Sequence, residues 1–357
     1  MMNLKIICPI CSSMDTGGFS PQSLLFPSIS NNEILPKHNN HICNTCGVVF
    51  LSPKPSEELL YKYYNDTYRK SEFAITTSDG TIDLPIQFPE SASSFYKFKN
   101  FIDCIENCSD KNSDILPSKD DLMVDIGGYQ GMFLYAAQQK YGVSGIVIDY
   151  NKSGIEYAKK AFDFNQSQAV KSNYEFFLEK KANFVTMVHS LEHIDDPKGL
   201  LEHIKNNILD KSGYLYIEAP NLFGSPLNDP AHCFTFSKES LTYLLNLCNF
   251  EILYMGTAGN PFAPLTLANS ELVLVCLAKI NYDNLEPTTD TKNLRKKVLN
   301  SYAKHSRKAI FRQARKTLRE LLKLCYYVLG HFILEKISRN LYGTIRRLKR
   351  LTSYRIH

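Results

Sequence analysis

The sequence has no long hydrophobic run. No stretch reaches the roughly 18 consecutive uncharged apolar residues that a membrane-spanning helix requires. The apolar run at the N-terminus is short and is interrupted by Pro9, which argues against a signal peptide. With 44% hydrophobic and 22% charged residues, the composition is that of a globular chain with a buried core. We therefore expect a cytoplasmic protein.

A complete dinucleotide-binding fingerprint, G-x-G-x-x-G, is also missing. Residues 121–150 (DLMVDIGGYQGMFLYAAQQKYGVSGIVIDY) nevertheless follow the order buried strand, glycine-rich turn, helix, second strand and acid. The turn contains Gly127, Gly128 and Gly131, which allow the backbone to approach a ligand. Asp149 comes about twenty residues later, where a carboxylate can accept both hydroxyls of a ribose. The pattern predicts a nucleotide-cofactor site.

Three features argue against NAD as that cofactor. The glycine spacing is wrong for a dinucleotide, and only one nucleotide-binding half is visible. Asp125 stands on the strand at the start of the turn, where it would repel a pyrophosphate but attract an ammonium group. A cofactor with a ribose, no phosphate and a cationic amino-acid end fits better, which favours S-adenosylmethionine (SAM).

The ten cysteines are unevenly placed, and four of them form two C-x-x-C pairs near the N-terminus. Cys8 and Cys11 make the first pair, and Cys43 and Cys46 the second. Two intervening residues let one tight turn direct both sulfurs at a single ion, so the four thiolates predict a closed, structural Zn²⁺ site. Iron suits the same tetrahedron, and ordinary buried or redox cysteines are the other alternative. His38 and His41 rank as weaker candidate ligands.

Three further segments follow the glycine turn in a recognisable order. They are NFVTMVHSLEHIDDPKGLLEHI (183–204), GYLYIEAPN (213–221) and AHCFTFSKESLTYLLNLCNFEILYM (231–255). Together with the turn they resemble class I SAM-dependent methyltransferases. With the cysteine pairs, the chain over about residues 5–280 resembles the subgroup that has an N-terminal four-cysteine zinc domain and occurs among sugar- and glycan-tailoring methyltransferases.

The resemblance implies an α/β fold with a Rossmann-like, seven-stranded, mostly parallel sheet that ends in an antiparallel hairpin, FEILYMG followed by residues 270–280. It also implies roles for individual residues. Gly127, Gly128 and Gly131 would lie under the methionine part of SAM, Asp125 near its amino group and Asp149 on the ribose. Tyr150 would lie against the adenine, Asn173 at its edge, and His189 beside the cofactor.

Four side chains are candidates for the general base that a hydroxyl or acidic carbon acceptor requires. Glu192 and His193 lie in LEHIDDP, Glu218 in IEAPN and His232 in AHCFTFS. In the resembling sugar methyltransferases, the Glu-x-Pro segment and the following His line the acceptor site. We therefore expect His232 to be the base and Glu218 its partner. His193 has an equally simple structural interpretation as a loop residue that bonds to the backbone.

The sequence divides into four parts. Residues 1–55 are the expected zinc ribbon, and 56–118 a linker helix and substrate lid. Residues 119–282 form the SAM-binding domain, and 291–357 a basic amphipathic helical tail. Within the second part, residues 74–94 have no clean period and are interpreted as a loop or lid. Its four tyrosines either line a substrate mouth or pack against the next domain: Tyr61, Tyr63, Tyr64 and Tyr68.

The tail differs electrostatically from the rest of the chain. Residues 291–357 hold 19 Lys or Arg and two acids, whereas the preceding 290 residues hold 22 basic and 34 acidic groups. A basic helix with an apolar stripe is typical of an in-plane anchor on an anionic membrane. That would place the protein at the inner membrane face. A dimerisation or partner arm is the second interpretation, and nucleic-acid binding the third, without any recognition motif to accompany it.

Two classes of function remain. The first is a SAM-dependent methyltransferase that acts on a hydroxyl or carbon of a sugar, a glycan precursor or a similar small metabolite. Large carbon-methylating members of the resembling family have a further C-terminal domain, whereas this sequence has the basic tail there. Methylation of oxygen is therefore at least as well supported as methylation of carbon. The second is a non-catalytic SAM-fold protein whose tail recruits a membrane or partner. HSLE stands where amino-methylating enzymes have an NPPY-type tetrad, which argues against nucleic-acid methylation.

Overall fold

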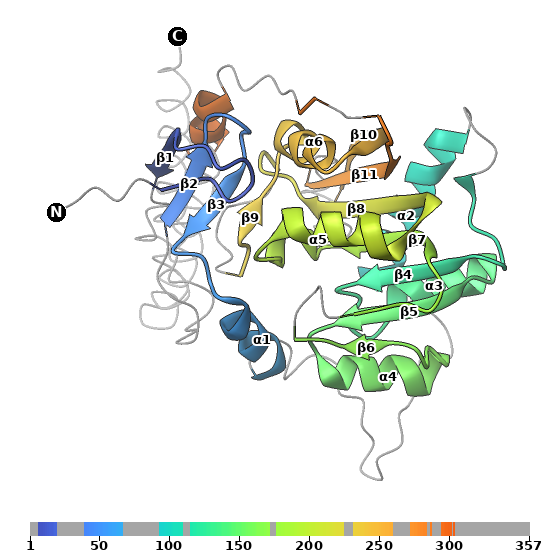
Figure 1. Ribbon diagram of the computed structural model, residues 1–357. Coiled ribbons are helices and arrows are strands. Elements are labelled where there is room, and N and C mark those ends of the chain that lie inside the picture. The colour runs from blue at the N-terminus through green and yellow to red at the C-terminus, as the bar shows by residue number, and fades with distance from the viewer. Residues whose placement is uncertain are drawn as a thin grey trace, which may run out of the picture. The chain divides into compact units, whose positions relative to one another are not determined.

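In the computed structural model of the chain, seven strands form one sheet in the order β10-β11-β8-β7-β4-β5-β6 (Figure 1). Strands β4 to β8 pair in parallel with their neighbours, whereas β11 lies antiparallel between β8 and β10. The predicted seven-stranded α/β fold with a terminal antiparallel hairpin is confirmed. The strands are β4 (Leu122–Ile126), β5 (Ser144–Asp149), β6 (Gln168–Ala169), β7 (Ala182–Val188), β8 (Leu209–Pro220), β10 (Phe250–Ala258) and β11 (Val273–Ile280).

The chain divides by its contacts into two units, Met1–Tyr302 and Ala303–His357. Almost all residues that the structure describes belong to the first unit. The described residues are 6–19, 39–66, 93–109, 115–171, 176–224, 231–259, 272–283, 286–287, 294–301 and 303. The predicted lid, apart from its last two residues, and nearly all of the basic tail therefore lie outside the described residues.

Helices cover both faces of the sheet because its central strands are apolar on both sides. All five residues of β4 are buried, as parallel strands require. Its alternate side chains enter different cores, so that Val124 packs with one helix layer and Met123 with the other. The Val124 layer holds α5 (Pro197–His203), the π-helix η4 (Ile204–Ile208) and α6 (Lys238–Leu247). The Met123 layer holds α2 (Ser93–Ser109), α3 (Met132–Tyr141) and α4 (Lys152–Phe162).

A second, four-stranded antiparallel sheet has the order β1-β2-β3-β9. Strands β1 (Thr16–Phe19), β2 (Asn39–Cys43) and β3 (Val49–Ser52) come from the predicted zinc ribbon. Strand β9 (Phe234–Thr235) comes from the AHCFTFS segment and pairs with β3, Phe50 lying opposite Phe234 (Figure 1). The small sheet is thus completed by a strand that begins two residues after His232.

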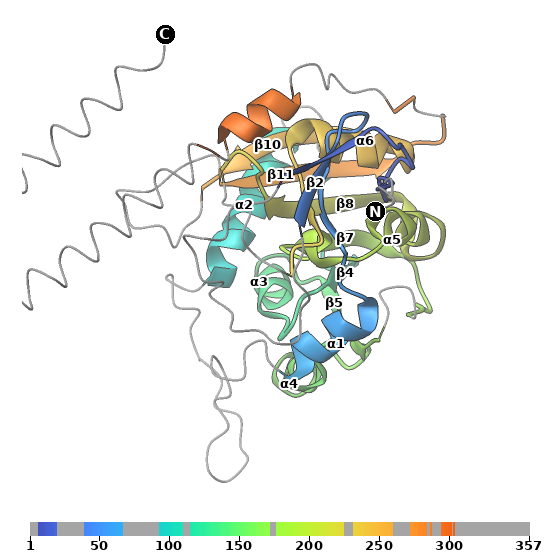
Figure 2. The same ribbon diagram turned by 90° about the vertical axis from the view of Figure 1, so that its left-hand side faces the viewer.

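Helix α1 (Glu57–Asp66) follows the small sheet and lies beside the carboxyl ends of β4 and β5 (Figures 1 and 2). Its side chains reach the chain just after β5, where Asn65 Nδ2 donates to the carbonyl of Tyr150 at 2.9 Å. In parallel α/β sheets this end is where ligands bind. The linker therefore contributes to the site as well as connecting two parts.

The start of the predicted tail is helical over residues 294–301. Leu294 and Val298 are buried there, in a small core with Ile42, Val49 and Leu222. This first part of the expected tail thus packs on the small sheet. Within the part of the chain that the structure describes, no helix has both the length and the apolar character to span a membrane.

Candidate active site

The glycine-rich turn runs from the end of β4 to the start of α3. Gly127 and Gly131 have φ values of 78° and 76°, in the left-handed region that favours glycine. A Cβ atom at Gly127 would lie 2.4 Å from Cβ of Ser190, and one at Gly128 would lie 2.4 Å from Oδ2 of Asp125. Both glycines are therefore needed for the loop to lie tightly against these two side chains.

Tyr129 is the non-glycine residue of this turn, and it also has a positive φ of 50°. A left-handed conformation costs a side-chain-bearing residue roughly 1 kcal/mol or more. The amide of Tyr129 donates to Oδ2 of Asp149 at 2.8 Å, and the amide of Asn151 donates to Oδ1 at 2.7 Å. Asp149 thus ties the loop to the end of β5, and a carboxylate can accept about four hydrogen bonds, so these two amides alone do not exhaust its capacity for ribose hydroxyls.

Asp125 is buried beneath the loop, with 1% of its surface exposed. The hydroxyl of Thr186 donates to Oδ1 at 2.7 Å. Burial raises the pKa of Asp125 to about 7, although Thr186 and the charge of Lys97 each lower it, while Asp149 raises it further. An ammonium group at the loop would stabilise the ionised acid. This chemistry fits the amino-acid end of SAM.

Tyr150 directly follows β5 and contacts α1. Its ring stacks on Tyr64 with centroids 6.2 Å apart and meets Tyr61 edge-on at 6.2 Å. Asn151 Nδ2 donates to the carbonyl of Tyr64 at 3.0 Å. These tyrosines therefore pack against the domain that carries the glycine loop. Asn173, predicted at the adenine edge, and Tyr68 lie outside the described residues.

His189 follows β7 with a positive φ of 54°. Its Nε2 lies 2.9 Å from Oε1 of Glu218, and its Nδ1 lies 3.5 Å from Oε1 of Glu192. Burial lowers the pKa of His189, but the two carboxylates outweigh burial and the net pKa is raised. Glu218 also accepts from Asn100 at 3.0 Å and from the hydroxyl of Tyr216 at 3.2 Å.

Glu218 differs from our expectation that it would be the partner of His232. Glu218 on β8 lies opposite Val188, the last residue of β7, so its carboxylate lies beside His189. His232 instead groups with Glu192 and His193, and their potential ligand atoms all lie within 4.8 Å of one another. The rings of His193 and His232 meet at 4.6 Å.

Glu192 and His193 belong to the short 3-10 helix η3 (Leu191–His193), directly after Ser190, which touches the glycine loop. Glu192 is 1% exposed. Burial raises its pKa, but the neighbouring histidines lower it to about 2, so the side chain is a carboxylate. His193 is held through Nδ1, which lies 2.7 Å from the hydroxyl of Tyr64 and 3.0 Å from the carbonyl of Ala231.

Residues outside our sequence-based set thus complete the site. Tyr64 belongs to the aromatic cluster of the linker, for which the sequence offers two interpretations, whereas the other four follow no pattern that would find them. The five residues are Tyr64 and Asn65 of α1, Asn100 of α2, Asn151 after β5 and Ser190 after β7.

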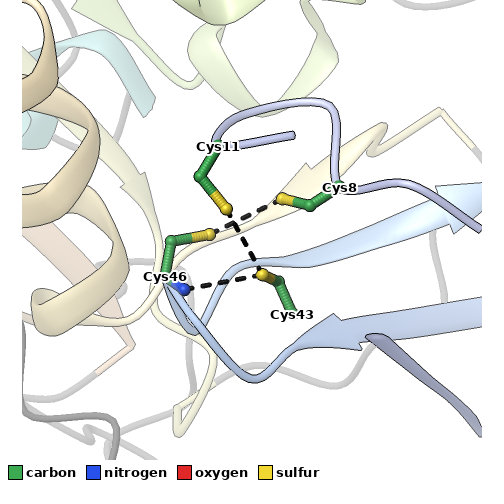
Figure 3. A group of neighbouring side chains, drawn as sticks. All are labelled: Cys8, Cys11, Cys43 and Cys46. Carbon is green, nitrogen blue, oxygen red and sulfur yellow. Dashed lines mark hydrogen bonds between the residues drawn. The ribbon is translucent and has the colours of Figure 1, made fainter. Parts of the chain in front are cut away.

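The four predicted metal-ligating cysteines come together at one end of the small sheet (Figure 3). Sγ of Cys8 lies 3.6 Å from that of Cys46, and Sγ of Cys11 lies 3.5 Å from that of Cys43. Thiolates about 2.3 Å from a shared Zn²⁺ stand about 3.8 Å apart in a tetrahedron. The arrangement therefore fits a four-cysteine zinc site. His41 does not belong to this group of close ligand atoms, and its ring packs near that of Phe50 at 5.8 Å. His38 is outside the described residues.

Comparison with known proteins agrees with the fold. Residues 105–254 match the family described as "Methyltransferase domain". No curated protein matches the sequence. The chain is similar to a SAM-dependent methyltransferase from Clostridium acetobutylicum, with 14% identity over 52% of this chain and 92% of that one and a TM-score of 0.38.

Two further solved structures show the same range of similarity. The plantazolicin methyltransferase BpumL, in complex with SAH, is 16% identical over 54% of this chain and 86% of its own, with a TM-score of 0.41. A SAM-dependent methyltransferase from Aquifex aeolicus is 14% identical over 54% of this chain and 98% of its own, with a TM-score of 0.38. The family match covers the glycine loop, Asp149 and the Glu192–His193–His232 group. The match of residues 105–254 to a methyltransferase domain, on a seven-stranded sheet of the predicted kind, supports a methyltransferase enzyme.

Proposed function

We propose that this methyltransferase methylates a hydroxyl group of a small polar acceptor, such as a sugar or a glycan precursor. The observation that carries the proposal is the group of Glu192, His193 and His232 next to the cofactor loop. Ser190, one residue before η3, touches Gly127 of that loop. A hydroxyl is a weak nucleophile and must lose its proton during transfer, so it needs such a basic group beside the cofactor.

Each half of the site has a separate task. Bound SAM supplies an electrophilic methyl group on a sulfonium. The glycine loop, Asp125 and Asp149 would bind and orient the cofactor, while the Glu192–His193–His232 group would receive the acceptor and stabilise its oxygen as the proton leaves. Alignment of the two reactants accounts for much of the rate in such a displacement.

The aromatic side chains around the group support a sugar-sized acceptor. Tyr64 contacts both Tyr150 and His193, and thus joins the cofactor side to the acceptor side. Tyrosine offers an apolar face and a hydroxyl, a combination that suits the faces and hydroxyls of a pyranose. The resemblance of the sequence to sugar-tailoring methyltransferases points the same way.

A turnover assay tests the acceptor half of the proposal. Purified protein, SAM and panels of sugar nucleotides and lipid-linked glycans are incubated, and S-adenosylhomocysteine (SAH) release is followed. His232→Ala is expected to bind SAH as the wild type does but to lose at least about 100-fold in turnover, the usual order for a general base. Unimpaired turnover of His232→Ala would remove this residue from the acceptor chemistry.

We also propose that the four-cysteine group holds one structural Zn²⁺ per chain. The close approach of the four Sγ atoms and the burial of Cys8, Cys43 and Cys46 support a closed site. Elemental analysis of protein purified without added metal is expected to find one equivalent of zinc. Less than about half an equivalent, or a matching amount of iron, would refute the assignment to zinc.

A further inference from the structure

The Glu192–His193–His232 group has the donor set of a metal site, separate from the four cysteines. Two imidazoles and one carboxylate lie with their potential ligand atoms within 4.8 Å of one another. Two histidines and a carboxylate that leave open coordination positions are a recurrent divalent-metal arrangement. The residues come from η3 and from the turn before β9, so only the fold brings them together.

The tautomer of His193 leaves its other ring nitrogen available as a ligand. Nδ1 lies 3.0 Å from the carbonyl oxygen of Ala231, which can only accept a hydrogen bond, so Nδ1 carries the proton. The oxygen of Tyr64, 2.7 Å away, is a second acceptor for the same proton. Nε2 therefore presents a lone pair. A ligating histidine is commonly held in this way, with its other N–H on a backbone carbonyl.

The carboxylate of Glu192 lacks hydrogen-bond partners among the described groups. Both of its oxygens are fully buried, and neither accepts a hydrogen bond from any of them. Oε1 lies 3.8 Å from Nε2 of His193, so a lone pair and a negative oxygen face one another across this gap. Nδ1 of His189 is the nearest cationic partner, 3.5 Å from the same oxygen, so this buried carboxylate is only partly compensated, which is costly. A cation between these atoms would remove that cost.

We infer that Glu192, His193 and His232 bind one divalent first-row transition-metal ion, whose open positions hold the hydroxyl oxygens of the acceptor. Ligand distances of about 2.0–2.2 Å require the donor atoms to close by up to about 1.4 Å, which small side-chain rotations could supply. Three protein ligands leave space for two neighbouring oxygens, which favours an acceptor with a vicinal diol. The acceptor assignment rests on the proposed hydroxyl methylation, whereas metal binding itself does not.

The metal would act as a Lewis acid in the reaction. His232 would then promote loss of the proton as a ligand of the metal and not as a free base. The metal lowers the pKa of the coordinated hydroxyl, whose proton passes to solvent. The acceptor oxygen then forms its bond to the methyl carbon as the bond from that carbon to the sulfonium breaks, which leaves SAH. No electron is gained or lost overall, so the ion need not change its oxidation state.

The test uses the full chain with its four-cysteine group already filled by Zn²⁺. Co²⁺ is added, and binding is followed by equilibrium dialysis and visible absorption. We expect one further equivalent of Co²⁺ with d–d bands but without thiolate-to-cobalt charge transfer, which would mark the cysteines. Glu192→Gln and His232→Gln should each weaken this binding at least about tenfold. Glu202→Gln makes the same substitution at an ion pair with Lys198, where the glutamate is 45% exposed, and should leave it unchanged.

The outcomes separate the metal site from the proposed function. No Co²⁺ beyond the zinc site, or equal binding by wild type and both variants, would overturn the metal site. The melting temperature provides a second readout that does not depend on activity. Co²⁺ should raise it for the wild type and Glu202→Gln but not for Glu192→Gln or His232→Gln. Co²⁺ binding without methylation of any diol would uphold the site and refute the proposed acceptor. Methylation of a diol by zinc-loaded protein, unaffected by added Co²⁺ or Mn²⁺, would uphold the function and refute the role of the metal.

Discussion

We expect the buried carboxyl group of Asp125 to make cofactor binding depend on pH. Its pKa is about 7 in the cofactor-free protein, against an ordinary value of 3.8. The amino group of SAH is a cation at neutral pH and would bind the ionised acid. If only that form binds SAH, affinity follows the ionised fraction of Asp125, which rises about eightfold from pH 6 to pH 7.5. We therefore expect SAH to bind about eightfold more tightly at pH 7.5.

Calorimetric titration measures this effect directly. Near pH 7 the binding of SAH should release about half a proton per chain, which titrations in buffers of different ionisation enthalpy reveal. Asp125→Asn should bind SAH more weakly and lose the pH dependence. Adenosine is the matched control ligand because it lacks the amino-acid end of SAH and its ammonium group. Its affinity should therefore not change over the same pH range. Equal SAH affinity at pH 6 and pH 7.5, or a pH dependence that survives in Asp125→Asn, would refute this reasoning.

The same pKa has a consequence for stability. Between pH 3.8 and about 7 the folded protein holds a proton on Asp125 that the unfolded chain has released. The contribution of this group to the free energy of unfolding therefore falls as pH rises through that window, by at most about 4 kcal/mol. Asp125→Asn should show a flatter profile and, without cofactor, be the more stable protein at pH 8 in urea unfolding.

Three further predictions concern the elements that hold the site. Asp149→Ala should weaken SAH binding at least about 100-fold in calorimetry, since the carboxylate accepts from the loop amide of Tyr129 and the amide of Asn151 and is expected to bind the ribose; unaltered affinity would remove it from the cofactor site. Removal of the cysteine-bound metal should increase hydrogen exchange at Phe234 and abolish turnover, because β9 is paired to β3 and follows His232; protection that persists in metal-free protein would contradict this coupling. Tyr64→Phe should reduce kcat about tenfold with little change in SAH affinity, because Nδ1 of His193 loses one of two hydrogen-bond acceptors; an equal effect on SAH binding would show a role in the cofactor half instead.

The small sheet that carries the cysteine group is hydrogen-bonded to the segments around the Glu192–His193–His232 group. Leu51 of β3 donates its amide to the carbonyl of Cys233 at 3.0 Å. Lys54, shortly after β3, bonds to the backbone carbonyl of Asp195, just beyond η3. Both segments that flank the Glu192–His193–His232 group are thus tied to the N-terminal sheet. Loss of that sheet should loosen the acceptor side while leaving Asp149 and the glycine loop in place.

Local sequence determined the cofactor loop and the cysteine site. In each, the chemically important residues lie within a few positions of one another or at the two ends of one strand–helix–strand unit. Gly127, Gly128 and Asp149 follow the geometry of that unit, and each C-x-x-C turn directs its own two sulfurs at one point. The meeting of the two turns, with Cys8 and Cys46 38 residues apart, depends on the small sheet. The seven-stranded sheet was predictable for the same reason, since its strands are short apolar runs in a recognisable order.

Tertiary structure alone decided which residues surround the Glu192–His193–His232 group. Tyr64 and His193 are 129 residues apart in the sequence, and His193 and Ala231 are 38 apart. Their contacts depend on where α1 and β9 dock, which no local period encodes. The partner of Glu218 was likewise set by its register opposite Val188, which turned it toward His189 and left Glu192 with His232. Spacing along the chain determines local turns, whereas side-chain neighbours across a sheet edge follow from packing.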